Sequence, residues 1–543
     1  MILKRRLKYS AYVLSTTIIL GIIIQLLGVL SLSKTVSYEN NKLRINPVLV
    51  NFSDSLLTIS NYFPHLIIGK AIANQSEIIR LSKIADLVSQ MIKESNSLYP
   101  YLSSSQNFND ILKNRNGIAK IQVTSEKLSP IASNISKLIA GNNEVNSLDT
   151  VFGKSTARPM KILSAFLEMG QNSNVLFGCE NESKFLLLIT SSAETRTLGG
   201  LIGQYAVVRS NCGTFKIDRV GTNTDLNDNR KFIKLFDLYP GLFQSNNPEW
   251  NNSNLIPDGL NLSKAWISAF EQQFQENIDG IIVVDTNILS KIAAVNGGLT
   301  AADGNKLNSA EEIDAYLRNG IYFQFPENQI KRKKHLLEIT EQLANSFQIS
   351  TLASNKISKA IIDAIGDDRM LIYLKNKNSR SDQLNQLNWS ESNNDTVYVG
   401  VNNLSGSKFD YYSNYSLSIL RCHNNRYLLT FSLSNNAKTD LIYPDYVARR
   451  LDNYNSKNIG VLNQFVLTYD RNYAQVIGQK ISSFSDVRTI QGESNRNLLS
   501  IVEYIEAKEK YKFSILFKSK HYLKFRMWGQ HIQLANSKYI NCR

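Results

Sequence analysis

Residues 189–205, ITSSAETRTLGGLIGQY, lie between two strongly apolar runs, FLLLI before them and YAVV after them. Both runs have the composition of buried strands. Glu194 and Arg196 interrupt this apolar segment, and Gly199 and Gly200 follow them. The pattern predicts two core strands joined by a polar loop, which either only connects the strands or binds a ligand.

The charged pair of this loop has two interpretations. In a plain turn, Glu194 and Arg196 form a solvated salt bridge worth less than about 1 kcal/mol. In a binding loop, the glycines let backbone N–H groups approach an anion, and Arg196 clamps a phosphate or carboxylate. Glu194 then orients the arginine or holds a divalent cation through water. These residues alone leave both interpretations open.

Length and charge limit the class of protein. A chain of 543 residues is expected to fold as two or three units. It has 61 Lys and Arg against 46 Asp and Glu, a net charge of +15, which favours anionic surroundings such as lipid headgroups or envelope polymers. The positive charge is scattered, and the sequence has no zinc-finger spacing or aromatic RNA-binding motif, so we do not expect nucleic acid as a partner.

The first segment predicts the compartment. Residues 1–8 contain four cations, and residues 9–33 form an uncharged, mostly apolar run long enough to span a membrane. The cations are expected on the cytoplasmic side, which places the bulk of the chain outside the cell membrane on one span. A cleaved signal peptide is the alternative, because Ser31 and Ser33 are small residues at a suitable spacing, but signal peptides have shorter apolar regions.

The four cysteines, Cys179, Cys212, Cys422 and Cys542, are compatible with an oxidising exterior. If the two apolar runs pair as an antiparallel hairpin, Cys179 and Cys212 lie near its two ends, where a disulfide is geometrically feasible. Isolated thiols are an equal alternative, because neither the number nor the spacing of the cysteines requires a bridge.

Three patterns follow the span. Residues 34–175 have apolar residues three and four apart, which predicts a helical stalk. Residues 176–375 alternate strand and helix patterns, which predicts an α/β layered domain. After a polar linker at 376–395, residues 396–543 contain short strands separated by turn-rich gaps, which predicts a β-sandwich.

Several motifs of the α/β part have local explanations. The run DGIIVVD at 279–285 is expected to be a strand buried on both faces. Asp258 and the pair Asp285–Thr286 are expected to cap helices. Lone His335 lacks partner histidines, so no metal site is expected there.

The segment KFLLLITSSAETRTLGGLIGQYAVV resembles the signature of a bacterial envelope family named domain of unknown function 4012. That family's loop runs Gln-Asn, a small residue or two, and then Glu-x-Arg-x-x-Gly-Gly. Thr190 and Ser191 replace the Gln and Asn, and four residues match the motif: Glu194, Arg196, Gly199 and Gly200. The resemblance continues through IPDG, which contains Asp258, and through ENIDGIIVVDTNILSKIAAVNGGLT, KRKKHLLE and VYVGVNNLSGSKFDYYSNYSLSI. It implies an envelope protein with one span, a helical stalk, an α/β core and a β-rich tail.

In element order the α/β core is also similar to the LytR–CpsA–Psr phosphotransferases, which attach undecaprenyl-pyrophosphate-linked glycopolymers to peptidoglycan. This resemblance implies anion-binding roles for Arg196 and for Arg332 in KRKKHLL. The Arg-Ser/Thr-Asp triplet of those enzymes is absent here, and their Arg-Gln pair becomes Arg332-Lys333. Loss of that carboxylate argues against the same phosphoryl transfer. The neighbouring cations could equally be the solvated face of a helix.

Three hypotheses follow. In the first, which is the preferred interpretation of the sequence, the chain is a single-pass envelope protein whose α/β core binds an anionic ligand such as a polyprenyl-phosphate-linked glycopolymer, and no cofactor or metal is expected. In the second, Glu194 and Asp258 hold a magnesium ion in an active glycopolymer phosphotransferase. In the third, the chain is a non-catalytic envelope scaffold and the Glu–Arg pair is a buried, self-satisfied salt bridge. The first requires Arg196 and Arg332 to meet at one open cleft. The ligand-binding residues predicted are Glu194, Arg196, Gly199, Gly200, Asp258 and Arg332, the expected partners are the membrane and the cell wall, and the oligomeric state stays open.

Overall fold

The structure is a computed structural model that describes residues 112–140, 162–226 and 250–346, most of 395–527, and shorter pieces at 36–45, 83–95, 360–385 and 532–535. The predicted span at residues 9–33 lies outside the described residues. Within the described part, no helix is both long enough and apolar enough to cross a membrane. The chain divides into two compact units, Met1–Glu180 and Asn181–Arg543.

The first unit is mainly helical where it is described. Helix α6 (Arg115–Ala140) carries the predicted apolar stripe, and its Leu128 and Ala132 pack against Leu167. Helix α8 (Ser173–Phe177) follows. The antiparallel hairpin of β1 (Val36–Glu39) and β2 (Lys42–Ile45) was not predicted.

A five-stranded mixed sheet is the centre of the α/β part, with the order β5-β4-β3-β6-β9. Only β3 and β6 are parallel; the other neighbours are antiparallel. The bounds are β3 Ser183–Arg196, β4 Gly199–Asn211, β5 Thr214–Thr222, β6 Gly280–Asp285 and β9 Leu371–Leu374. The prediction of mixed α/β structure is confirmed.

Helices cover both faces of this sheet. Successive residues of a strand point to opposite sides, so the apolar strands of this sheet have an apolar surface on each face. Helix α10 (Gly259–Phe274) packs Trp266 and Phe270 on the face that includes Leu188 and Val283. Helix α11 (Thr286–Val295) packs Ile288 on the face that includes Ile189. A small hairpin, β7 (Leu299–Thr300) and β8 (Lys306–Leu307), follows α11.

A further group of helices builds a third core. It consists of α12 (Ala310–Ala315), the π-helical turn η3 (Tyr316–Gly320), α13 (Ile321–Gln324) and α14 (Gln329–Ser346). Their Ile313, Ile321 and Ile339 pack together with Phe409 and Tyr443 from the C-terminal part. The α/β layer and the C-terminal sheets therefore share side chains in one core.

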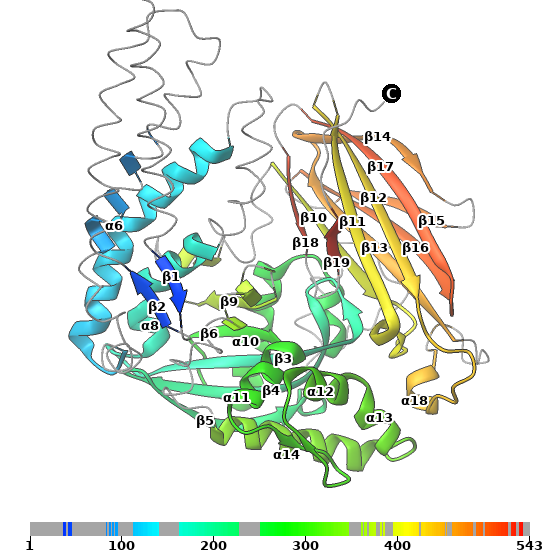
Figure 1. Ribbon diagram of the computed structural model, residues 1–543, viewed down its shortest axis with the longest axis horizontal. Coiled ribbons are helices and arrows are strands. Elements are labelled where there is room, and N and C mark those ends of the chain that lie inside the picture. The colour runs from blue at the N-terminus through cyan, green and yellow to red at the C-terminus, as the bar shows by residue number, and fades with distance from the viewer. Residues whose placement is uncertain are drawn as a thin grey trace, which may run out of the picture. The chain divides into compact units, whose positions relative to one another are not determined.

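Two five-stranded sheets make up the C-terminal part (Figure 1), with the orders β15-β16-β13-β10-β18 and β14-β17-β12-β11-β19. Residues from both sheets, such as Val399, Leu429 and Phe513, form one core between them. The first sheet contains β10 (Thr396–Asn403), β13 (Gly460–Asp470), β15 (Asp486–Gln491), β16 (Arg496–Glu506) and β18 (Lys524–Met527). The second contains β11 (Ser413–Cys422), β12 (Arg426–Asn435), β14 (Ala474–Lys480), β17 (Lys510–Ser519) and β19 (Ile532–Ala535).

The stretch 189–205 is not a loop, so this prediction was wrong. Strand β3 continues to Arg196, β4 begins at Gly199, and only two residues turn the chain. Ser191 pairs with Leu201 and Thr195 with Gly200, so the three residues between Ser191 and Thr195 form a bulge in β3. Such an insertion re-aims side chains where the regular ladder stops. Ladder pairs on both sides of the bulge, Ser191 with Leu201 and Thr195 with Gly200, hold the segment that contains the polar motif.

The described cysteines, Cys179, Cys212 and Cys422, are all disulfide-bonded. The alternative of isolated thiols was therefore wrong for these three residues.

The close pairing at the bulge predicts that Gly200→Ala destabilises the protein. A Cβ at Gly200 would overlap the Ser191 carbonyl, whereas a Cβ at Gly203 in the same strand would meet no atom within 4 Å. We expect Gly200→Ala to lower the free energy of unfolding of the full chain by about 1–3 kcal/mol, as measured by urea denaturation. Gly203→Ala is the matched control and should be neutral. Equal losses in the two variants would contradict the described strand pairing.

Candidate functional site

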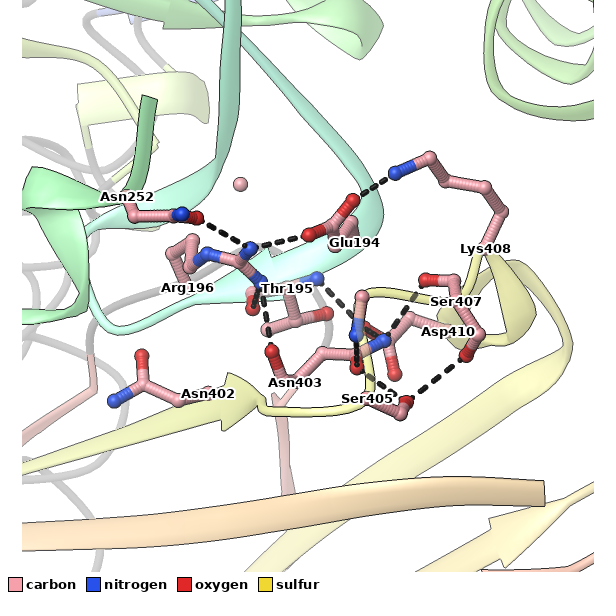
Figure 2. Close-up of polar contacts among 12 residues, drawn as sticks. Glu194, Thr195, Arg196, Asn252, Asn402, Asn403, Ser405, Ser407, Lys408 and Asp410 are labelled. Atoms are coloured by element: carbon pink, nitrogen blue, oxygen red, sulfur yellow. Dashed lines mark hydrogen bonds and ion pairs between the residues drawn. The ribbon is translucent and has the colours of Figure 1, made fainter. Parts of the chain in front are cut away.

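The Glu194 carboxylate lies between two cations (Figure 2). One oxygen accepts from Nη2 of Arg196 and the other from Nζ of Lys408. Glu194 is 4% exposed, Arg196 3% and Lys408 4%. The interpretation as a solvated salt bridge was therefore wrong, because all three charged groups are buried.

The two Nη nitrogens of Arg196 also donate to uncharged protein groups (Figure 2). Nη1 donates to the carbonyls of Thr195 at 3.0 Å and Asn403 at 2.9 Å, and Nη2 donates to Oδ1 of Asn252 at 3.0 Å. Nε is buried without a hydrogen-bond partner among the described residues. Burial lowers the pKa of Arg196 to about 10, against the opposing charge of Asp410. The guanidinium therefore stays cationic at neutral pH.

Asp410 is the second buried carboxylate of this cluster, and it lies in the short helix η4 (Phe409–Tyr412). It accepts hydrogen bonds from Thr195 N at 2.6 Å, from Asn403 Nδ2 at 2.8 Å and from the Tyr415 hydroxyl at 2.7 Å. Burial raises the pKa of Asp410, and these hydrogen bonds oppose the shift. Asp410 thus attaches the backbone of β3 to the C-terminal part.

The turn after Arg196 is held from two sides. Thr197 donates from its backbone N at 2.7 Å and from Oγ1 at 2.9 Å to Oδ1 of Asn402, at the end of β10. A Cβ at Gly400 would lie 2.6 Å from Cγ2 of Thr197, so this glycine makes room for the turn. From the short helix η2 (Trp250–Leu255), Asn254 Nδ2 donates to the Gly200 carbonyl at 2.6 Å. The tip of the β3–β4 hairpin is therefore enclosed by η2 and β10.

One protein-family model matches the segment that contains this hairpin. The family model described as "Protein of unknown function (DUF4012)" matches residues 180–322. The resemblance inferred from the sequence is thereby confirmed for this segment. No curated protein and no solved structure matches the chain.

Five of the six predicted ligand-binding residues lie in the DUF4012 segment. Glu194 and Arg196 are in direct contact. Gly199 has φ +104°, which favours glycine in the turn, and Gly200 permits the close strand pairing. Asp258 caps α10 and accepts from Asn261 N at 2.9 Å and from Asn261 Nδ2 at 2.7 Å. The expected capping role of Asp258 is confirmed.

Arg332, in α14, lies beyond the DUF4012 segment and is buried, with 3% exposure. The interpretation of this residue as part of a solvated helix face was wrong. Its Cζ lies 3.8 Å from the ring centroid of Tyr446, and Nζ of Lys408 lies 5.3 Å from the same centroid. Tyr446 therefore links Arg332 to the Glu194 cluster.

Sequence analysis missed Lys408 and Asp410 as members of the site, together with the asparagines Asn252, Asn402 and Asn403. A signal was present, because the polar run NNLSGSKFD follows the buried strand TVYVGV directly. Among the residues that the structure describes, no group of three or more His, Cys, Asp or Glu side chains could hold a metal ion.

The buried charges predict a large cost for Glu194→Gln. This change leaves Arg196 and Lys408 without their shared carboxylate, and breaking a buried ion pair typically costs about 3–5 kcal/mol. Urea unfolding of the full chain should show a loss of that size. Asp486→Asn is the matched control, because the Arg488–Asp486 pair is exposed at 52% and 47% and should contribute less than about 1 kcal/mol. A Glu194→Gln variant as stable as the control would contradict the assigned network.

Lys408 predicts a pH dependence of stability. Burial lowers its pKa from 10.5 to about 7, while the charge of Asp410 opposes the shift. Between these two pH values the unfolded chain binds a proton that the folded chain has released, so this lysine makes the free energy of unfolding rise with pH. Wild type should gain stability relative to Lys408→Met as the pH increases from 7 to 9 in urea unfolding. Parallel pH profiles would show that Lys408 titrates normally.

Proposed function

We propose that the chain is a non-catalytic scaffold of the cell envelope, in which the Glu194 cluster joins the α/β core to the β-sandwich. One observation supports this function above the others. The Glu194 carboxylate, the two Nη nitrogens of Arg196 and the Asp410 carboxylate are buried and form hydrogen bonds with protein groups from separate segments. An arrangement of this kind fixes the geometry of two parts of a chain.

An anion clamp at Arg196 is the competing function. A ligand would have to displace Glu194, Asn252 or Asn403 from the guanidinium and reach a side chain that is 3% exposed. Displacing Glu194 would also leave a buried carboxylate with Lys408 as its remaining ion pair. Because an incompletely compensated buried charge is costly, the geometry favours the scaffold over the clamp.

A phosphotransferase based on Glu194 and Asp258 would need both carboxylates to be free for the reaction. Glu194 is bound by two cations, and both oxygens of Asp258 accept hydrogen bonds from Asn261. A general acid or base must reach the proton that it transfers. In the proposed scaffold, Glu194 acts as an ion-pair partner of two cations and Asp258 acts as a helix cap.

The proposed location is outside the cell membrane, with residues 9–33 as a single span and residues 1–8 in the cytoplasm. The uncharged run and the four cations before it support this topology. The disulfide-bonded Cys179, Cys212 and Cys422 also support an oxidising compartment. The net charge of +15 suits a position near anionic envelope polymers.

Lipid analysis of the full chain tests this function against the clamp. The chain is extracted from membranes in detergent, and bound anionic lipid is measured by native mass spectrometry in wild type, Arg196→Met and Arg209→Met. Arg209 is the matched control, since its side chain is 37% exposed. The scaffold predicts recovery in the membrane fraction and the same lipid content in all three proteins. Loss of a lipid in folded Arg196→Met, but not in Arg209→Met, would replace the scaffold with the clamp.

A further inference from the structure

The two sheets of the C-terminal sandwich differ in charge. The strands of the first sheet contain four carboxylates and four cations, so their charges balance. The strands of the second sheet (Figure 1) contain no aspartate or glutamate. Their cations are Arg421, Arg426, Lys480, Lys510, Lys512 and Lys518. The second sheet is therefore the basic half of the sandwich.

Most of these cations point away from the core. Side chains alternate between the two faces of a strand, and Phe431, Phe513 and Ile515 belong to the core between the sheets. Lys480 is the cross-strand partner of Ser514, which lies between these two core residues of β17. The cations that point outward are Arg426, Lys480, Lys510, Lys512 and Lys518. The outer surface of β11, β12, β14 and β17 that contains these five residues is called the basic face.

Hydroxyl groups lie beside the lysines on the basic face. Across the strands, Lys510 is opposite Ser434 and Lys512 is opposite Ser432. Further outward hydroxyls come from Ser416, Ser418, Thr430 and Ser514. The face thus combines point charges with groups that both donate and accept hydrogen bonds.

The charges of the basic face are not compensated by the protein. Arg426 lies directly opposite Lys518, and like charges in this position destabilise a sheet. Nε of Arg426 is buried without a hydrogen-bond partner among the described residues. None of the ion pairs between described residues includes a cation of this face. The nearest carboxylate in the sequence, Glu509, lies in the turn before β17 and accepts from Glu506 N at 2.9 Å.

We infer that the basic face binds a long anionic polymer rich in hydroxyl groups, which is a polysaccharide or polyol chain with phosphate or carboxylate groups. Outward positions recur about every 7 Å along a strand, so Lys510 and Lys512 offer charges in a regular step that a repeating anion can follow. The centre of a protein–protein interface is depleted of lysine and serine, which are the residues that dominate here. The inference rests on the proposed location outside the membrane, and it adds a partner to the scaffold function.

Polymer titrations of the detergent-purified full chain test this face. Fluorescein-labelled poly(glycerol phosphate) and polygalacturonate are the hydroxyl-rich polyanions, poly-L-glutamate is a polyanion without hydroxyls, and dextran is an uncharged glycan. Fluorescence anisotropy measures binding at low and at high sodium chloride, because salt screens exposed charges. We expect wild type to bind at least one hydroxyl-rich polyanion more tightly than poly-L-glutamate and dextran. The double variant Lys512→Gln/Lys518→Gln should bind that polymer at least tenfold more weakly at low salt.

Lys331→Gln/Lys334→Gln is the matched control, because it removes two exposed cations from α14 and changes the net charge equally. It should bind as wild type does, and equal midpoints of urea unfolding show that the variants fold. Where the first double variant is less stable, Lys512→Gln alone takes its place, with Lys334→Gln as control.

Three results overturn the inference. They are the absence of binding by wild type, equal losses of affinity in the variant and its control, and binding of poly-L-glutamate at least as tight as that of both hydroxyl-rich polyanions. The third result would identify an acidic protein as the partner. The basic face shares no residue with the Glu194 cluster, so its failure is distinguishable from failure of the scaffold function.

Discussion

The Glu194 carboxylate bridges two buried cations that come from different parts of the chain. Arg196 is two residues away in β3, whereas Lys408 is 214 residues away, just before η4. Burying these groups is expensive, so the bridge need not add much stability compared with an apolar joint. Its effect is on geometry, because any movement of β3 relative to the C-terminal part would separate charges that water cannot reach. Two further contacts connect β3 to the C-terminal part. Ala193 belongs to the same apolar cluster as Phe409 and Tyr443, and Asp410 accepts a hydrogen bond from the backbone of Thr195.

The position of the bridge follows from the sheet. Strands β3 and β6 run parallel and their pairing ends at Thr190 and Asp285, where α11 begins. Beyond that point β3 has β4 as its remaining ladder partner, and the bulge follows at once. Polar side chains therefore gather past the carboxyl ends of the two parallel strands, where open α/β sheets commonly place their ligands. In this chain the C-terminal β part occupies that place.

Sequence patterns predicted most of the elements, since β3, β6, α10 and α11 have clear apolar periodicity and clear ends. The site was only half predictable. Glu194 and Arg196 stand out in an apolar segment, but the same polar letters made a bulged strand look like a loop. Lys408 could not be paired with Glu194, because no local spacing relates residues so far apart. Arg332 lies in a run of four basic residues, and composition does not tell which one of them turns inward.

The bulge in β3 also bears on how relatives of this protein can be recognised. Residues 192–194 have no partners on β4, so their number decides which side chain arrives beside Lys408. With one residue more or fewer in the bulge, the side chains that follow would point to the opposite face of the sheet. A neighbour of Glu194 would then lie beside the lysine. The Glu-x-Arg letters alone are then a weak criterion. Two further criteria identify chains that share this joint. One is the number of residues between the apolar strand and the glutamate, and the other is a lysine two positions before an aspartate in the C-terminal part. Chains that lack them share only the hairpin.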